Sequence, residues 1–240
     1  MGMTYLQEQF KFEDIQENEY PLYQRLEDRS LRAAGVRLLY RRKLERNRFI
    51  IATLGASING DRLDFNYLEY ANTNFLFLIG KDLNPRTRLA YGVAFSFDLG
   101  IPAVYPVFVY EHRMAQRWKV EMRLPKNIQL RYCFSDKAYL AAKVSIAGAS
   151  YHLEKELLQG YDKLELRRSA LRAGLAFDRE IYDWLWFRGE AGVTKPINLF
   201  ISEPGEGRPN SLIDVRINQI PYAHFTLYLV PPRKICEKYF

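Results

Sequence analysis

The sequence contains no stretch of about 18 consecutive apolar residues, the length that a membrane-spanning helix needs. Its strongest apolar run, residues 75–80, ends at Lys81. A helical membrane protein is therefore excluded. Residues 1–10 also lack the charged and apolar regions of a secretory signal. We expect either a chain whose signal has been removed or a cytoplasmic protein.

Cysteine and catalytic motifs are scarce too. The chain has two cysteines, Cys133 and Cys236, in no metal-binding spacing, and whether they pair stays open. It has no nucleophile elbow, zinc-protease motif, phosphate-binding loop or dinucleotide fingerprint. His152 lies near Ser150 and Asp162, but the sequence does not show that they converge. We therefore predict no enzymatic activity, no metal and no cofactor.

Charge is the first property present in excess. The formal net charge is +7 and the isoelectric point about 9.3, which permits nucleic acid or anionic lipid as a partner. A basic cluster falls at the end of an expected strand and its turn: Arg37, Arg41, Arg42, Lys43, Arg46 and Arg48. The remaining charges alternate with apolar residues. This distribution favours contact with lipid headgroups, so we predict a bilayer with lipopolysaccharide as partner, and no nucleic acid.

Alternation with a period of two is the dominant pattern. In residues 88–98 the large apolar side chains occupy every second position from Leu89 to Phe97, and small or charged residues occupy the positions between them. A helix would scatter these residues around its circumference. The same pattern predicts strands at residues 118–124, 128–134, 140–146, 171–177, 185–193 and 213–229, and less clearly at 35–44, 49–59, 63–80 and 103–113.

The number of strands follows from parity. About eleven strands are expected from Ala33 onward, whereas a closed antiparallel barrel with both termini on one side needs an even number. A strand before Ala33, or a division of residues 63–80, gives twelve, which we prefer; merging residues 118–134 gives ten. We expect residues 1–32 to form a leader, a periplasmic segment or a first strand, and residues 33–240 to form the barrel.

Three features favour a barrel in a membrane over one in water. The polar face of the strands is rich in small residues, such as Ala90, Gly92 and Ala94, which suit a narrow lumen. Aromatic residues, 15% of the chain, gather near the turns as in interfacial girdles. Several strands span ten or more residues. We therefore predict an all-β fold: a single closed, antiparallel, up-and-down transmembrane β-barrel of the bacterial outer membrane.

The landmarks of residues 103–151 carry a resemblance: Pro106, Trp118, Leu124-Pro125, Leu130-Arg131-Tyr132 and residues 148–151. This stretch resembles a family of uncharacterised, porin-like outer-membrane β-barrel proteins from Bacteroidota-type bacteria. The resemblance continues through residues 172–193 and covers about two thirds of the chain. It implies a fold and no chemistry.

Charged residues on the face opposite the apolar one are the candidate functional set, because they would line the lumen. They are Arg88, Asp98, Lys119, Glu121, Arg123, Arg131, Lys143, Arg172, Asp178, Arg188, Glu190, Asp214 and Arg216. One interpretation is a narrow pore for small solutes with a weak preference for anions. The alternatives are a non-conducting accessory or scaffold subunit with other outer-membrane proteins as partners, and a soluble ligand-binding β-barrel.

Overall fold

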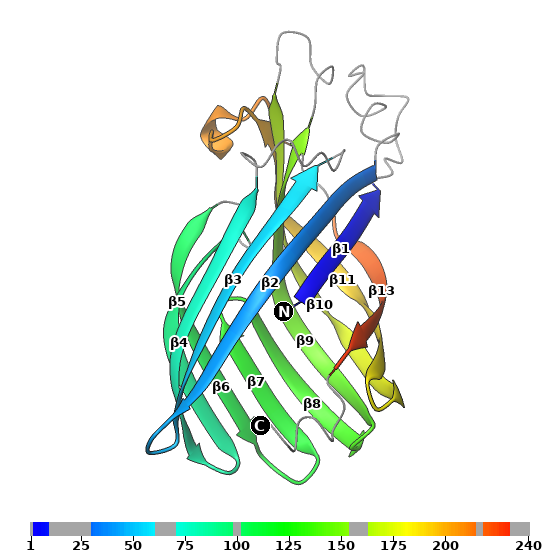
Figure 1. Ribbon diagram of the computed structural model, residues 1–240. Coiled ribbons are helices and arrows are strands. Elements are labelled where there is room, and N and C mark those ends of the chain that lie inside the picture. Colours follow the sequence, from blue (N-terminus) through cyan, green and yellow to red (C-terminus); the bar gives the residue numbers. More distant parts are fainter. Residues whose placement is uncertain are drawn as a thin grey trace.

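A computed structural model describes residues 2–9, 30–60, 71–97, 102–153, 163–214 and 218–230. These residues form thirteen strands and one short 3-10 helix, Arg208–Asn210 (Figure 1). The strands are β1 Gly2–Gln9, β2 Ser30–Leu44, β3 Arg48–Gly60, β4 Asn72–Asn84, β5 Thr87–Ser96, β6 Ala103–Arg113, β7 Trp118–Leu124, β8 Asn127–Ser135, β9 Ala138–Leu153, β10 Leu164–Tyr182, β11 Leu185–Ser202, β12 Ile213–Asp214 and β13 Ile220–Leu229. No helix of these residues is long and apolar enough to cross a membrane.

The strands form one sheet in which each of β1 to β11 pairs antiparallel with the next. Most short connections lie at one end, which we call the short-turn end: residues 45–47, 85–86, 114–117, 136–137 and 183–184 (Figure 1). The short connection of β7 with β8, residues 125–126, lies at the opposite end. The opposite end holds the connections of β9 with β10 and of β11 with β12. The expected all-β, up-and-down arrangement is confirmed.

The strand count differs from the expected twelve and from the alternative of ten. The stretch predicted as one strand at residues 213–229 contains two, β12 and β13, which pair with different parts of β11. β12 pairs with Phe200 and Ile201, whereas β13 pairs along β11 from Leu185 to Thr194. Residues 215–217 between them lie outside the described residues.

Closure also differs from a single barrel of all strands. The sheet closes through β3 and β9, which meet in one parallel pair, Gly60 with His152, so that seven strands form the closed barrel and the others extend it. β8 pairs with β9 only as far as Ser145, which leaves the rest of this edge of β9 available. The amide of Asn72 donates to the Ser150 carbonyl at 3.2 Å and supports the contact. Within the described ranges no pairing joins β1 to β13.

Candidate functional site

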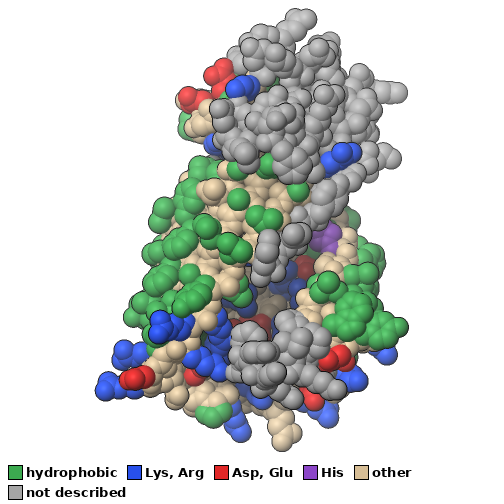
Figure 2. Space-filling view, in the orientation of Figure 1, with side chains coloured by type: hydrophobic (Ala, Val, Ile, Leu, Met, Phe, Trp, Pro, Cys, Tyr) green, Lys and Arg blue, Asp and Glu red, His purple; other side chains and the backbone are tan. Residues whose placement is uncertain are grey.

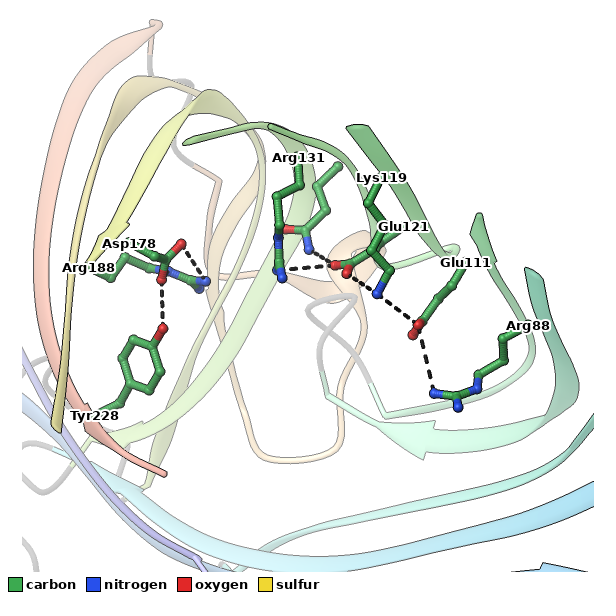
Figure 3. Close-up of polar contacts among 9 residues, drawn as sticks. Arg88, Glu111, Lys119, Glu121, Arg131, Asp178, Arg188 and Tyr228 are labelled. Carbon is green, nitrogen blue, oxygen red and sulfur yellow. Dashed lines mark hydrogen bonds and ion pairs between the residues drawn. The ribbon is translucent and has the colours of Figure 1, made fainter. Parts of the chain in front are cut away.

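The two faces of the sheet differ in exposure as the alternation predicts. On β5, Ala90 and Ala94 are buried, whereas Tyr91 is 63% and Val93 47% exposed. The charged residues of this inner face point into the interior of the barrel in the close-up (Figure 3). Candidate lumen residues and lipid-facing candidates are therefore on opposite sides of one wall.

The first group of inner charges runs across β4 to β8. Arg88 Nε donates to Asp82 at 2.7 Å, and Arg88 Nη1 lies 3.9 Å from Glu111. Lys119 Nζ bridges Glu111 at 3.0 Å and Glu121 at 2.6 Å. Arg131 Nη2 completes the row 3.2 Å from Glu121, which also accepts a short hydrogen bond from Gln129 (Figure 3). Each of these carboxylates has at least one cation beside it, as partly buried charges require.

A second group lies on β10, β11 and β13. Arg188 binds the fully buried carboxylate of Asp178 with two nitrogens, at 2.7 and 3.1 Å. The Tyr228 hydroxyl donates to the same carboxylate at 2.8 Å (Figure 3). Above this pair, Glu190 accepts from Lys143 at 3.1 Å and from Tyr222 at 2.7 Å.

Aromatic rings join the two groups. The Arg131 guanidinium lies 4.6 Å from the ring centre of Tyr139, and Tyr139 contacts Trp186 with ring centres 5.3 Å apart. Trp186 in turn stacks on Tyr228 at 6.3 Å. We call the continuous set the belt: Asp82, Arg88, Glu111, Lys119, Glu121, Arg131, Tyr139, Trp186, Tyr228, Asp178 and Arg188. Its charges are closely balanced.

Several inward arginines have no carboxylate beside them. Within the described ranges, Arg37, Arg41, Arg123 and Arg172 form no ion pair. Arg41 lies 5.8 Å from the ring centre of Phe49, and Arg172 lies 5.6 Å from that of Tyr222. Arg172 Nε is buried without a hydrogen-bond partner. These arginines give the inner face an excess of positive charge beyond the balanced belt.

The outer face of the same strands is apolar and exposed. Leu175 on β10 is 55% exposed, and Phe225 and Leu227 on β13 are 78% and 66% exposed. Figure 2 shows such side chains on both sides of a hollow in which Lys, Arg, Asp and Glu are visible. Monomeric soluble proteins rarely carry apolar surface of this extent. We call this part of the molecule, with its polar inside and apolar outside, the barrel body.

The polarity of the two faces reverses toward the other end. On β10, Leu164 and Leu166 are buried on the inner face, although Leu171 and Leu175 point outward. Leu166 pairs with Tyr151 on one side and with Ile201 on the other, so the reversal crosses three strands in register. The buried inner cluster contains Leu31, Tyr151, Leu153, Leu164, Leu166, Leu199 and Ile201. We call this region, residues 31–33, 147–153, 164–169 and 196–214, the cap.

The outer face of the cap is polar, and a buried ion pair lies there. Glu165 accepts from Arg167 at 2.6 Å and from the Ser150 hydroxyl. Arg167 Nη1 donates to the Glu206 carbonyl at 2.7 Å, which holds the connection after β11 against this face. Burial opposes the charge of Glu165, but the hydrogen bonds from Arg167 and Ser150 outweigh it and hold the pKa of Glu165 below its usual value. The cap is thus buried on both faces, with an apolar cluster on the inner face and a hydrogen-bonded polar set on the outer face.

The predicted lumen residues divide into five sets. The structure places Arg88, Lys119, Glu121, Arg131, Asp178 and Arg188 in the belt, and Lys143 and Glu190 together above it. Arg123 and Arg172 lie on the inner face without an ion pair. Asp214 lies in the cap, where it binds the exposed Arg208 at 2.8 Å, and not in the belt. Asp98 and Arg216 lie outside the described residues.

Sequence reasoning missed some members of the belt. Asp82 lies beyond the end of the strand expected at residues 63–80, so no face could be assigned to it. Glu111 lies two positions after Val109, which is buried, in the strand expected at residues 103–113. Alternate residues of a strand share a face, so this spacing could have placed Glu111 on the inner face. Tyr228 lies on the predicted polar face of the last strand, but its role requires the pairing of β13 with β11.

The arrangement offers little for catalysis at the residues considered. The Ser150 hydroxyl donates to Glu165 and is fully buried, so it is not positioned as a nucleophile activated by His152. Asp162 lies outside the described residues. Among the residues that are described, no three His, Cys, Asp or Glu side chains gather in a way that could hold a metal ion.

Comparison with known proteins gives a family without an assigned activity. No curated protein matches the chain. No solved structure matches it either. Residues 3–203, most of the sequence, match the model of a family described as a domain of unknown function, DUF6268. This description names neither a porin nor a source organism. The chain is a member of the DUF6268 family.

Proposed function

We propose that this chain is an integral β-barrel of the bacterial outer membrane, with a bilayer containing lipopolysaccharide as its surroundings, and that its charged lumen is a narrow pore for small solutes. The observation that carries the proposal is the reversal of polarity along continuous strands. We also propose that the chain is related to the porin-like outer-membrane barrels that residues 103–151 resemble.

The reversal has a simple physical cause if the surroundings of the wall change. A strand in water buries its apolar side chains on the inner face throughout, as the cap does with Leu166. A strand in lipid turns them outward, as the barrel body does with Leu171. On β9, β10 and β11 the change falls near one level, because Ile146, Leu171 and Lys195 are partners in register. This level would be the boundary of the bilayer.

The length of the apolar part agrees with a membrane crossing. On β9 the barrel body runs from Ala138 to Ile146, and on β10 it runs from Leu171 to Tyr182. Tilted strands of about 9–11 residues cross the hydrocarbon core. The charged belt and the unpaired arginines would then face a water-filled lumen within the membrane.

Two measurements test the proposal. Cell fractionation and extraction should recover the chain with the outer membrane and only with detergent; a protein that stays soluble without detergent would instead support a soluble ligand-binding barrel and remove the membrane assignment. Folded protein in planar lipid bilayers should give small, uniform conductance steps. Their absence from protein shown to be folded and inserted would contradict the pore.

One observation favours a second candidate function. The apolar cluster of the cap fills the inner face at one end, and the contact of β3 with β9 narrows that end further. A barrel closed in this way could serve as a non-conducting accessory subunit that binds other outer-membrane proteins. Native mass spectrometry of complexes extracted from membranes tests it: a defined partner supports the accessory role, and a lone monomer counts against it.

A further inference from the structure

A cavity of about 460 Å³ lies at the short-turn end of the barrel. Its lining includes the turn residues Asn47, Asn84 and Arg86 and the inner-face residues Arg88 and Lys119. The cavity therefore connects the turns to the belt, at the mouth where a solute would enter the lumen. Its volume is in the range of sites that bind small molecules.

The acidic groups of this cavity are already neutralised. Asp82 accepts from Arg88 Nε at 2.7 Å. Glu111 lies 3.0 Å from Lys119 Nζ and 3.9 Å from Arg88. A bound anion would therefore meet carboxylates whose charge is compensated by neighbouring cations.

Two further arginines in the cavity wall, Arg86 and Arg113, have no such compensation. Both are exposed, and neither forms an ion pair within the described part of the chain. The Arg113 amide donates to the Arg86 carbonyl at 2.9 Å, so the two residues are held beside one another. The Thr87 hydroxyl contacts His112 Nδ1 at 2.9 Å and ties the same two strands together. The mouth thus presents two arginines whose backbones are neighbours, whose side chains both line the cavity, and which form no ion pair within the described residues.

We propose that Arg86 and Arg113 bind a small soluble dianion, such as inorganic phosphate or a short dicarboxylate, at the mouth of the barrel. Each guanidinium offers a planar pair of donors that matches a phosphate or carboxylate edge. Asn84 accepts the Arg86 amide through Oδ1 at 2.9 Å, which leaves its amide nitrogen as a further donor. Because the site is open to water, the anion binds weakly. Weak binding suits the entrance of a pore, which must also release its solute.

This inference deepens the proposed pore by naming the class of solute, but its test needs no conductance. The full chain, folded in a phosphate-free maltoside detergent, is titrated with inorganic phosphate at pH 8, and the ³¹P line width is followed. The R86Q/R113Q variant should bind phosphate about tenfold or more weakly, since it loses charge-assisted hydrogen bonds. The matched control is R117Q/R179Q, which removes two exposed arginines that do not line the cavity.

The outcomes separate the alternatives. Loss of binding in R86Q/R113Q alone, together with displacement of phosphate by succinate and not by glucose, supports the site. Equal weakening in both variants would show a general effect of surface charge and overturn it, as would absence of phosphate binding to the unaltered protein. Displacement by dihexanoyl phosphatidylglycerol at concentrations far below those of succinate would overturn the assignment to a soluble anion, because a lipid headgroup would then be the ligand. None of these results depends on whether the barrel conducts.

Discussion

In the barrel body, β10 turns Leu171 and Leu175 outward and Arg172 inward; in the cap, the same strand turns Leu164 and Leu166 inward. The pairing of β10 with β9 continues through the change without a shift of register. On β9 and β10 the reversal therefore comes from which residue types alternate. On β11 the pairing with β10 shifts register between Ser169 and Ala170, so the backbone itself moves Leu199 and Ile201 to the inner face there.

Different interactions therefore stabilise the cap and the barrel body. The cap buries apolar side chains against each other, which is the dominant favourable contribution in water. Among the described residues of the body, the apolar interior is limited to the small cluster of Phe49, Leu78, Ala90 and Val109, and the rest of the inner face is held by ion pairs. Variants in the two regions should respond differently, and each prediction below tests that contrast.

The largest effect is expected from Leu166→Ala in the cap. Leu166 is 3% exposed between Tyr151 and Ile201, and its truncation should cost the cap about 2–5 kcal/mol. Hydrogen exchange of residues 164–169 should accelerate accordingly, and single-channel conductance should rise if the cap restricts passage. Leu171→Ala is the control on the outer face of the same strand and should leave exchange in the cap unchanged. Unaltered exchange in Leu166→Ala would contradict the description of the cap as a separately packed core.

The next effect concerns the outer surface of the body. Leu175→Arg should destabilise the barrel in lipid vesicles by about 2–4 kcal/mol, because it places a charge in the hydrocarbon region. Leu212→Arg, at an exposed leucine of the cap, should change stability by less than about 0.5 kcal/mol. Urea titrations of folding into vesicles compare the two. Equal tolerance of arginine at both positions would mean that no lipid surrounds the body.

A smaller, pH-dependent effect is expected at Glu165, which lies in the cap beyond the apolar band. Its pKa is lowered on folding, so its carboxylate stabilises the cap at pH values above about 4.5. This contribution should decline as the pH falls through 4.5 and on through the lowered pKa. Glu165→Gln should cost about 1.5–3 kcal/mol near neutral pH and should flatten the acid dependence. Hydrogen exchange of the cap, corrected for its intrinsic pH dependence, measures both; an unchanged pH profile in the variant would remove Glu165 as the cause.

The faces of the body could be predicted from sequence because they depend on one strand at a time. The alternation of Tyr91 and Val93 with Ala90 and Ala94 is enough to separate exposed from buried positions, and the structure confirms the all-β barrel that follows from it. No knowledge of the neighbouring strands is needed. The belt is different, because it requires register: Glu121 meets Lys119 on its own strand but Arg131 on the next.

The cap and the closure of the sheet could not be predicted in the same way. Leu164 and Leu166 occupy even-numbered positions, and Leu171 an odd-numbered one, so they lie on opposite faces of the strand. The strand expected from sequence begins at residue 171, so Leu164 and Leu166 were not assigned to a face. Closure depends on the pairing of Gly60 with His152, which no local pattern encodes. The expected count of twelve strands was wrong for a related reason. The residues of β12 and β13 follow one alternating pattern in the sequence, and only their pairing with different parts of β11 separates them into two strands.

The smallest effect is expected inside the body, at Arg188. Arg188→Lys keeps the charge but loses the two-nitrogen contact with Asp178, whose hydrogen bond from Tyr228 remains. We expect a loss of about 1 kcal/mol in urea unfolding from vesicles. Arg179→Lys is the matched control, because Arg179 adjoins Asp178 in the chain but is exposed and forms no ion pair within the described ranges. Equal stability of the two variants would mean that the belt does not hold the wall together. A loss as large as that of Leu166→Ala would instead mean that the interior of the body is dry, in which case a lumen for solutes would be excluded.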